Sequence, residues 1–482
     1  MTTFLGIDVG TSSVRVVLFD DTGVVVASNA ASYETLREGG GVVEQDPTSW
    51  TDALVRALAA IPELALYPPR AIGLCGQTPT LVLVDERGSP TRNALTWQDS
   101  RASLEARDLA EHFGDPRALV GTELPWSAAN MPAKLLWLAR HEPQTVARSS
   151  TVVQPKDYVG HALTGTWVSD PWSSKGLCGV YEGEPLGELL EACGWSANVC
   201  PPTAAPWSSR GEVGAAASER FGLRVGTPVT VGASDALAEM IAAGCFARSS
   251  AFVFSGTSSI VGTTVPDTDS RVAGLFNVPT SCAPLPLLYG PTNSGGAVLQ
   301  WAATLLGCDV DELLALAHGA GTTWPVFVPY LSGERAPLWD LDVRALFLGV
   351  DESHGRAEMA MAVVAGVFLA ARDVLALIEA ATGTAPHEVE IVSRGVRDAH
   401  WESLALRTLG LPLRFHDDAD MSARGAAMLA LALDGTGVVE ASRQLATTSR
   451  VATPAPHDVD GARHLLVEYQ RAVAHALEWR RR

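Results

Sequence analysis

Residues Phe4 to Arg15 read FLGIDVGTSSVR, and this stretch decides the fold. A buried strand ends near Asp8, a tight turn follows at Gly10-Thr11-Ser12-Ser13, and a second strand carries Arg15 and continues to Phe19. Backbone N–H groups and hydroxyls in such a turn can bind phosphate oxygens, and a carboxylate beside them can bind Mg²⁺. The alternative interpretation is a β-hairpin with an ordinary polar turn.

The same pattern returns half a chain later. From Ala251 the sequence reads AFVFSGTSSIVGTTV, in which a strand enters, Gly256-Thr257-Ser258-Ser259 turns, and a strand leaves. Two hairpins with one tip sequence predict two related lobes, with a boundary near residues 244–250. The second copy has neither an aspartate before its glycine nor an arginine after its turn. We therefore expect any metal carboxylate to come from the first lobe only.

The composition indicates a globular protein that is not built to bind nucleic acid. The 482 residues are 47% hydrophobic and carry a net charge of −19, which argues against nucleic acid and anionic membranes as partners. Seven cysteines without a CxxC pair indicate buried, reduced thiols rather than disulfides or a zinc site. The longest apolar run, Met359 to Ala371, is too short to cross a bilayer and is typical of a buried helix. Since the chain enters a strand by Phe4, we expect no signal peptide and a cytoplasmic protein.

Polar residues follow several predicted strands, where open α/β sheets bind their ligands. The strand 71–75 is followed by Gln77. The strand 94–97 ends in Trp97 and is followed by Asp99 and Arg101. These side chains are candidates to line one pocket. The alternatives are surface turn residues and, for Trp97, a core tryptophan.

A further strand, from Pro228, ends in Gly232-Ala233-Ser234-Asp235 and opens an Ala-rich helix. Asp235 is thus a candidate catalytic carboxylate. The alternative is an ordinary acidic helix cap.

The common nucleotide and hydrolase motifs do not occur. The sequence has no GxxxxGK[ST] loop, no GxGxxG after a strand, no HExxH and no Gly-x-Ser-x-Gly elbow. What remains is a design in which β-turns from two lobes hold the phosphates of one nucleotide.

With these motifs in order, the sequence resembles the FGGY family of carbohydrate kinases, over nearly the whole chain. The resemblance rests on Asp8-x-Gly10-Thr11-x-Ser13-x-Arg15, Glu44-Gln45-Asp46-Pro47, Trp97-Gln98-Asp99-x-Arg101, Lys134-Leu135-Leu136-Trp137, Gly232 to Asp235, Ser255 to Ser258, and Pro329 to Pro337. It implies an α/β fold of two actin-like, ribonuclease H-like lobes, residues 1–244 and 245–482, with a nucleotide and sugar cleft between them. It also implies ATP-dependent phosphorylation of a sugar hydroxyl, with a ketopentose such as xylulose or a related polyol as substrate. A homodimer is left open.

The resemblance assigns roles residue by residue. Asp8 holds Mg²⁺, and Asp235 is the general base for the sugar hydroxyl. ATP is expected at Gly10, Thr11, Ser12, Ser13, Arg15, Gly256, Thr257, Gly296 and Gly395, and the sugar at Gln77, Thr78, Trp97, Asp99 and Asp235.

Several segments depart from the family pattern, among them the loop Ser173-Ser174-Lys175 and two loops at expected ligand sites. Thr78-Pro79-Thr80 stands where xylulokinases usually carry Met-His-Gly, and Ser393-Arg394-Gly395-Val396 keeps one glycine of a usual Gly-Gly-Gly-Ala. The altered loop at 393–396 leaves open a degenerate kinase fold that binds sugar without catalysis. The two hairpins alone would also fit an actin-like ATPase that acts on protein partners.

Overall fold

A computed structural model describes residues 1–266, 272–393, 399–416 and 420–480. The chain forms two compact units. Unit 1 comprises residues 1–247, 278–285 and 420–447, and unit 2 comprises residues 248–277, 286–419 and 448–482. Two later segments, residues 278–285 and 420–447, belong to unit 1, so this division is not a single cut of the chain. The family-based domain boundary at 244/245 stays a prediction. Each unit is described by itself.

Unit 1 is built on a mixed sheet whose strand order is β10-β11-β6-β1-β2-β3, with β12 paired to β6. Its strands are β1 (Thr3–Val9), β2 (Ser13–Asp20), β3 (Val25–Ser32), β6 (Ala71–Gly76), β10 (Ser209–Glu212), β11 (Pro228–Thr230) and β12 (Ala233–Ser234). Strands β1, β2 and β3 are antiparallel and precede the first helix, α1 (Pro47–Ala59), as predicted. Strands β6 and β12 extend the sheet in parallel.

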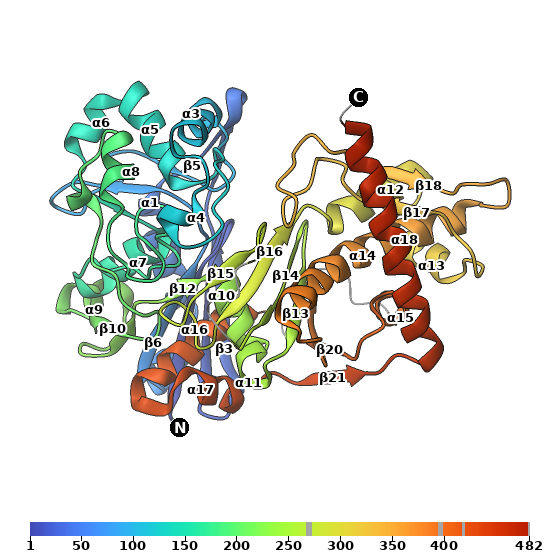
Figure 1. Cartoon of the computed structure of the whole chain (residues 1–482). Helices are drawn as coiled ribbons and strands as arrows, with labels where there is room; N and C mark the ends of the chain where they lie inside the picture. Colours follow the sequence, from blue (N-terminus) through green and yellow to red (C-terminus); the bar gives the residue numbers. More distant parts are fainter. Residues whose placement is uncertain (267–271, 394–398, 417–419, 481–482) are drawn as a thin grey trace. The chain divides into compact units, whose positions relative to one another are not determined.

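The two faces of this sheet carry different side chains because neighbouring residues in a strand point to opposite sides. On one face, Leu5 and Ile7 join the buried cluster of Trp50 from α1. On the other face lies α16 (Met421–Leu431), which Figure 1 shows in red beside the blue strands. A Cβ at Gly6 would lie 1.8 Å from the carbonyl oxygen of Ala423, so glycine is required for this approach.

Two small sheets and several helices complete unit 1. Strands β4 (Leu36–Glu38), β5 (Val42–Gln45) and β8 (Ala94–Leu95) form one sheet, and β7 (Val82–Val84) pairs with β9 (Thr151–Val153). The helices include α3 (Ser103–Phe113), α5 (Met131–His141), α7 (Pro155–Thr164) and α10 (Asp235–Ala242). The strand predicted over 94–97 is thus only two residues long and lies outside the main sheet.

Unit 2 repeats the plan with the strand order β15-β16-β14-β13-β19-β20-β21. These strands are β13 (Ala251–Ser255), β14 (Ser259–Thr264), β15 (Phe276–Val278), β16 (Leu287–Thr292), β19 (Val389–Ser393), β20 (Leu413–His416) and β21 (Ser449–Ala452). Its helices include α12 (Gly296–Leu306), α13 (Val310–His318), α14 (Arg356–Thr382), α15 (Ala399–Leu409) and α18 (Pro456–Arg480). Strands β13 and β14 form the predicted second hairpin, and β19 lies parallel to β13.

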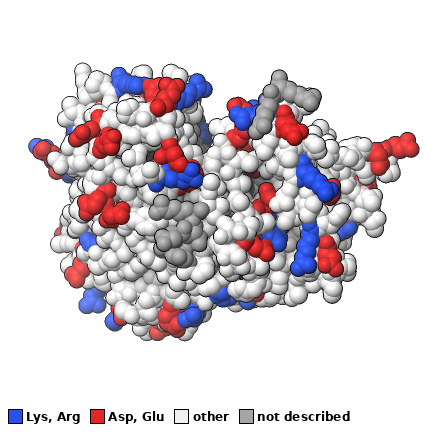
Figure 2. All heavy atoms as spheres, viewed as in Figure 1, with Lys and Arg blue, Asp and Glu red and all other residues white. Residues whose placement is uncertain are grey.

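Helix α14 confirms the prediction of a buried helix in the apolar run 359–371, whereas the expectation of a segment too short to cross a bilayer is wrong for the whole helix, which is 27 residues long. Among the described residues it is the one helix that is long and apolar enough to cross a membrane, by length and composition alone. Of its most apolar window, 78% is buried inside the protein, where it packs in the core of unit 2. A core helix of a globular protein passes the same test. On the face seen in Figure 2, acidic and basic side chains are interspersed rather than gathered into one basic patch.

Candidate active site

Asp8 and Asp235 lie at the carboxyl ends of neighbouring parallel strands. Asp8 in β1 is opposite Cys75 in β6, and Cys75 is opposite Ala233 in β12, two residues before Asp235. The Cys75 thiol lies 3.5 Å from Asp8 Oδ1. Burial raises the pKa of Cys75, and the charges of Asp8 and Asp235 raise it further. The two carboxylates therefore converge on one buried thiol, at the sheet edge where the sequence predicted a site.

The capping alternative for Asp235 is resolved by its neighbour. The N-cap of α10 is Ser234, whose Oγ accepts a hydrogen bond from the N–H of Leu237 at 3.3 Å. Asp235 is the first helical residue, is half-buried, and accepts a hydrogen bond from Ala236 N–H at 2.8 Å. A carboxylate in the first turn also gains from the helix dipole. The cap is thus made by Ser234.

Lys175 adds a positive charge near Asp235. Burial lowers the pKa of Lys175 to about 8, against the opposing effect of Asp170, Cys282 and Asp235. Its ammonium donates to the carbonyl oxygen of Trp172 at 3.2 Å and lies 4.6 Å from the centre of that ring. Lys175 belongs to a loop that fits the family pattern poorly, so sequence comparison gave it no role.

The turn of the first hairpin (β1, β2 and residues 10–12) is held from behind by side chains. Tyr33 Oη donates to the carbonyl oxygen of Gly10, and Gln45 Nε2 donates to that of Thr11 at 2.7 Å. In a trans peptide the N–H points away from the preceding C=O. The N–H groups of Thr11 and Ser12 therefore point away from these donors, and neither has an acceptor within the described part of the chain. Such N–H groups form a concave anion site.

Tyr33 and Gln45 were not among the predicted site residues. Gln45 lies in the Glu44-Gln45-Asp46-Pro47 motif, which was noted without a role. Tyr33 has no motif around it, and only its fold position brings it to Gly10. Burial raises the pKa of Tyr33, as does the nearby charge of Asp8. Its hydroxyl therefore stays a neutral donor to Gly10.

Arg15 and the first turn approach a residue of the returning segment. Arg15 lies opposite Asp8 on the neighbouring strand, and its guanidinium lies 2.8 Å from the carboxylate of Asp420. The Arg15 side chain is about two-fifths exposed, at 39%. An exposed cation next to the turn that was predicted to bind phosphate suits such a ligand.

Two predicted sugar-binding residues lie beside the same turn. Trp97 is 39% exposed, and its indole N–H donates to Thr11 Oγ1 at 3.3 Å. The Gln77 side chain is buried and donates to Gln45 Oε1 at 2.8 Å, while Thr78 beside it is half-buried. The premise that both loops follow strands of one sheet is wrong, since β8 lies in a separate sheet. The structure nevertheless brings Trp97 and Gln77 to the phosphate turn.

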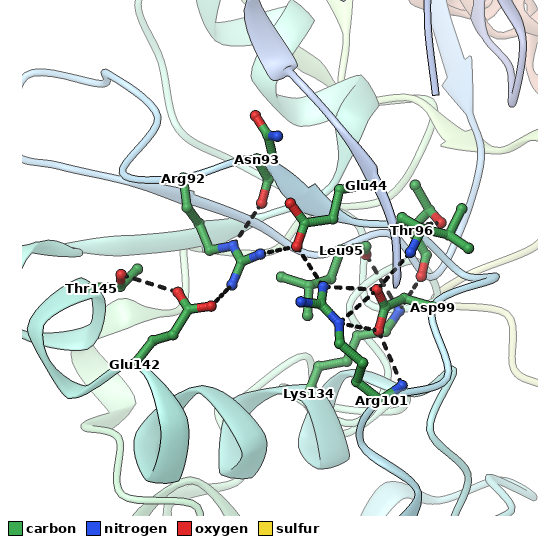
Figure 3. Close-up of polar contacts among 11 residues, drawn as sticks. Glu44, Arg92, Asn93, Leu95, Thr96, Asp99, Arg101, Lys134, Glu142 and Thr145 are labelled. Atoms are coloured by element: carbon green, nitrogen blue, oxygen red, sulfur yellow. Dashed lines mark hydrogen bonds and ion pairs between the residues drawn. The ribbon is translucent and has the colours of Figure 1, made fainter. Parts of the chain in front are cut away.

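Asp99 is enclosed in an ion-pair network (Figure 3). It is 1% exposed, lies 2.8 Å from Arg101, and accepts a hydrogen bond from Val43 N–H at 2.9 Å. Arg101 continues to Glu44, and Glu44 to Arg92. A substrate-binding role for Asp99 stays a prediction, and these contacts favour a bracing role for its carboxylate.

Lys134 connects the two loops that the sequence predicted to bind the sugar. Its ammonium donates to the carbonyl oxygens of Pro79 at 3.3 Å, Leu95 at 3.3 Å and Thr96 at 2.7 Å. Burial lowers the pKa of Lys134 to about 7. The Lys134-Leu135-Leu136-Trp137 motif therefore supplies a structural cation beneath Thr78 and Trp97.

The turn of the second hairpin (β13, β14 and residues 256–258) is held by main-chain donors instead. Gly296 N–H donates to the carbonyl oxygen of Gly256 at 2.8 Å, and Ala297 N–H donates to that of Thr257 at 3.0 Å. A Cβ at Gly296 would lie 2.7 Å from the Gly256 oxygen. The predicted residues Gly256, Thr257 and Gly296 are thus brought together. Gly395 lies outside the described residues, and Ser393 before it pairs with Ser255 at the base of this hairpin.

Glu334 and Arg335 order this second turn, a role that the sequence did not specify. The buried Glu334 carboxylate accepts hydrogen bonds from Asn293 N–H at 2.5 Å and from Ser294 Oγ at 2.6 Å. Arg335 donates to Ser258 Oγ at 3.0 Å. The second hairpin has no counterpart of Arg15, and Arg335 from the loop 330–337 supplies a guanidinium to its turn instead.

The donor set suits a magnesium ion that is completed by substrate. Among the described residues, no group of three or more His, Cys, Asp or Glu side chains could hold a metal ion by itself. Mg²⁺ prefers oxygen ligands and is commonly bound by one or two carboxylates together with phosphates and water. Asp8, half-buried beside the phosphate turn, offers such a ligand.

Comparison with known proteins matches both halves of the chain. The FGGY family of carbohydrate kinases matches residues 3–242 with its N-terminal domain and residues 251–433 with its C-terminal domain. The chain is 31% identical over 442 residues to the xylulose kinase of Escherichia coli K12, covering 89% of each chain. It is 27% identical to the gluconokinase of Bacillus subtilis, covering 75% of this chain and 74% of that one.

Solved structures agree on the fold. A xyloylose kinase from Brucella ovis superposes with a TM-score of 0.88 and 26% identity, covering 98% of this chain and 100% of that chain. A xylulose kinase from Rhodospirillum rubrum gives a TM-score of 0.90 at 24% identity over the full length of both chains. These matches confirm the predicted mixed α/β fold of two actin-like, ribonuclease H-like domains.

Proposed function

We propose that this chain, which belongs to the FGGY family of carbohydrate kinases, transfers the γ-phosphoryl group of ATP to a hydroxyl of a ketopentose or related polyol. The sugar kinase activity follows from the family and from relatives at up to 31% identity over most of the chain. The sugar, the magnesium ion and the residue roles are the proposal. The observation that carries it is the convergence of Asp8 and Asp235 beside the turn at Thr11.

Asp235 acts as the general base. Its carboxylate takes the proton of the sugar hydroxyl as the hydroxyl oxygen bonds to the γ-phosphorus and the bond to the ADP oxygen breaks. The start of α10, fixed by the Ser234 cap, holds this carboxylate at the strand end. Lys175 lies near enough for the charge of Asp235 to raise its pKa against the larger effect of burial, so a cation lies close to this carboxylate.

Asp8 would hold Mg²⁺, which when bound neutralises charge on the phosphate oxygens. The N–H groups of the first turn and the guanidinium of Arg15 supply further donors to those oxygens. The second turn, with Gly296 behind it, is proposed to bind the nucleotide phosphates. Each turn belongs to its own unit.

The substrate class rests on relatives and on one exposed aromatic ring. Several relatives are xylulose kinases, which supports a ketopentose as substrate. Trp97 presents 39% of its surface beside Thr11, and such a ring can pack against the apolar face of a sugar. The loop Thr78-Pro79-Thr80 departs from the xylulokinase pattern, so a related polyol remains within the proposal. A cytoplasmic location and a homodimer stay predictions.

The test is a panel of ketoses and polyols with ATP and Mg²⁺, in which ADP and sugar phosphate are both measured. We expect D-xylulose or a close relative to give turnover, and Asp235→Asn to lower kcat by about 10²–10⁴ while sugar still binds. Ser234→Ala is the comparison variant, because it loosens the start of α10 and keeps the carboxylate, so stability should fall by about 1 kcal/mol and kcat far less than in Asp235→Asn. Sugar binding without turnover by the wild type would contradict the proposal, and a near-normal Asp235→Asn rate would remove the base role.

A further inference from the structure

The amide of Gln45 is buried and uses its complete hydrogen-bonding capacity. Its Nε2 donates to the carbonyl oxygen of Thr11 at 2.7 Å and to Thr35 Oγ1 at 2.8 Å. Its Oε1 accepts from Gln77 Nε2 at 2.8 Å and from Trp50 Nε1 at 3.2 Å. A glutamine amide has two N–H donors and two acceptor lone pairs, so all four are used. The side chain is 1% exposed.

This arrangement fixes the orientation of the amide. Two N–H donors face its oxygen and two oxygens face its nitrogen, so a flipped amide would set donor against donor and acceptor against acceptor. A buried polar group that loses its partner costs about 1–3 kcal/mol. Gln45 is therefore held in one position from two sides.

The two ends of the amide reach two different parts of the proposed site. The nitrogen holds the Thr11 carbonyl, which turns the following N–H of Ser12 away from Gln45 and toward an incoming phosphate. The oxygen holds Gln77, which follows β6 at the proposed sugar site. Thr80 Oγ1 donates to the other end of Gln77 at 3.3 Å, so the substrate loop is tied into the same chain.

We propose that Gln45 is a positioning residue that aligns the sugar site with the phosphate turn. It touches neither ligand and acts through Gln77 and Thr11. The inference rests on the proposed function, because it takes Gln77 as part of the sugar site. When this bridge is lost, ATP still binds, but the sugar hydroxyl and the γ-phosphorus no longer meet at attack distance. A misplacement of about 1 Å can cost a hundredfold in rate, and water then competes as the phosphate acceptor.

The decisive variant is Gln45→Met, which keeps the size and neutrality of the side chain and removes all four hydrogen bonds. ADP and sugar phosphate are measured separately, with ATP and the best sugar of the wild-type panel. We expect kcat for sugar phosphorylation to fall about 30- to 100-fold and the ratio of ADP to sugar phosphate to rise well above one. A purely structural role would lower the amount of active enzyme and leave this ratio at the wild-type value.

Two control variants remove hydrogen bonds from the same amide without touching either part of the site. Trp50→Phe removes one donor to Oε1, and Thr35→Val removes one acceptor from Nε2. Both are expected to keep the product ratio near one and kcat within about threefold. A raised ratio in both controls would contradict the inference, because the effect would then not depend on the bridge.

The remaining outcomes are separable. Wild-type protein without sugar turnover contradicts the proposed function and this inference with it, whereas an active wild type and a Gln45→Met variant with a normal ratio and rate contradict the inference alone. If Gln45→Met does not fold, Gln45→Asn decides, because it keeps the amide and is one methylene too short to span Thr11 and Gln77. A normal product ratio in folded Gln45→Asn would overturn the proposal.

Discussion

The two hairpins share a tip sequence, and in each the carbonyl oxygens of the turn accept hydrogen bonds, but the donors differ. In both turns the carbonyl oxygens of the glycine and the threonine accept hydrogen bonds from behind. At the first hairpin the donors are the side chains of Tyr33 and Gln45. At the second hairpin they are the main-chain N–H groups of Gly296 and Ala297, at the start of α12.

This difference shows how one turn can serve two tasks. Side-chain donors connect the first turn to the residues around it, and Gln45 also contacts Gln77. Main-chain donors connect the second turn to the start of α12, which requires glycines for close approach, and Arg335 adds one side-chain donor at Ser258. We infer that the first turn is built for alignment with an acceptor, and the second for holding a nucleotide.

The largest expected effect concerns the carboxylate that only the first hairpin carries. Asp8→Asn keeps the shape of the side chain and removes its charge, so we expect kcat to fall by about 10³ or more and the Mg²⁺ concentration for half-maximal rate to rise. Steady-state kinetics over a range of Mg²⁺ concentrations measures both. Phe254→Leu, at the same position of the second hairpin, is the control and should leave the Mg²⁺ dependence unchanged. Equal Mg²⁺ dependence in wild type and Asp8→Asn would refute this asymmetry.

The next effect tests the main-chain donors of the second hairpin. A Cβ at Gly296 would lie 2.7 Å from the carbonyl oxygen of Gly256, so Gly296→Ala must push the turn or the helix start away. We expect the KM for ATP to rise about tenfold while the KM for sugar stays within twofold. Gly319→Ala is the control, because its Cβ would meet its neighbours at an ordinary 3.6 Å. A change confined to the sugar KM would contradict the assignment of this turn to the nucleotide.

Much of this contrast could be predicted from sequence, because it depends on local patterns. Both hairpins follow from alternating apolar residues around a Gly-Thr-Ser-Ser turn, and both were found where predicted. Asp8 was predicted as the metal carboxylate, because the second hairpin has no acidic residue before its glycine. Asp8 lies opposite Cys75, which in turn lies opposite Ala233 in β12, the strand before Asp235. This agrees with the rule that open α/β sheets bind ligands at the carboxyl ends of their strands.

What the sequence did not reveal depends on contacts between distant residues. The hydroxyl of Tyr33 reaches Gly10 only because β3 pairs with β2 and leads the chain back. Asp99 was assigned to a pocket because it follows a predicted strand. Its partner Arg101 lies two residues further along the chain, whereas the Val43 N–H that it accepts from belongs to β5, 56 residues away, and no local pattern indicates that contact. Spacing along the chain carries no information on such partners.

The third effect concerns the titration of Lys134, a side chain of the first unit. The main-chain N–H groups that hold the second hairpin do not titrate near neutral pH. Burial lowers the pKa of Lys134 from its ordinary 10.5 to about 7 in the folded protein. Between these values the unfolded chain binds more protons, so this group makes folding more favourable as pH rises above 7, by up to about 1.4 kcal/mol per pH unit. Below pH 7 both states are protonated and the contribution is flat.

The measurement is the free energy of unfolding in urea at pH 7, 8 and 9, for wild type and Lys134→Met. The difference between them should grow with pH in favour of the wild type. Lys156→Met is the matched control, since burial lowers the pKa of Lys156 but Asp157 and Asp170 outweigh it, so the net shift is upward and Lys156 stays charged over this range. Parallel profiles for wild type and Lys134→Met would show that Lys134 does not titrate near neutrality.

The smallest expected effect is on the side-chain donor that holds Gly10. Tyr33→Phe removes one hydroxyl and leaves the ring in place, so the first turn loses one of its anchors while Gln45 keeps the other. A lost hydrogen bond of this kind costs about 0.5–1.5 kcal/mol. We expect stability in urea to fall by that amount and kcat by about two- to fivefold, with the KM for ATP nearly unchanged. Tyr67→Phe, at an exposed tyrosine of the same unit, is the control. A Tyr33→Phe variant that loses ATP affinity and keeps kcat would show that the two turns do not divide their tasks in this way.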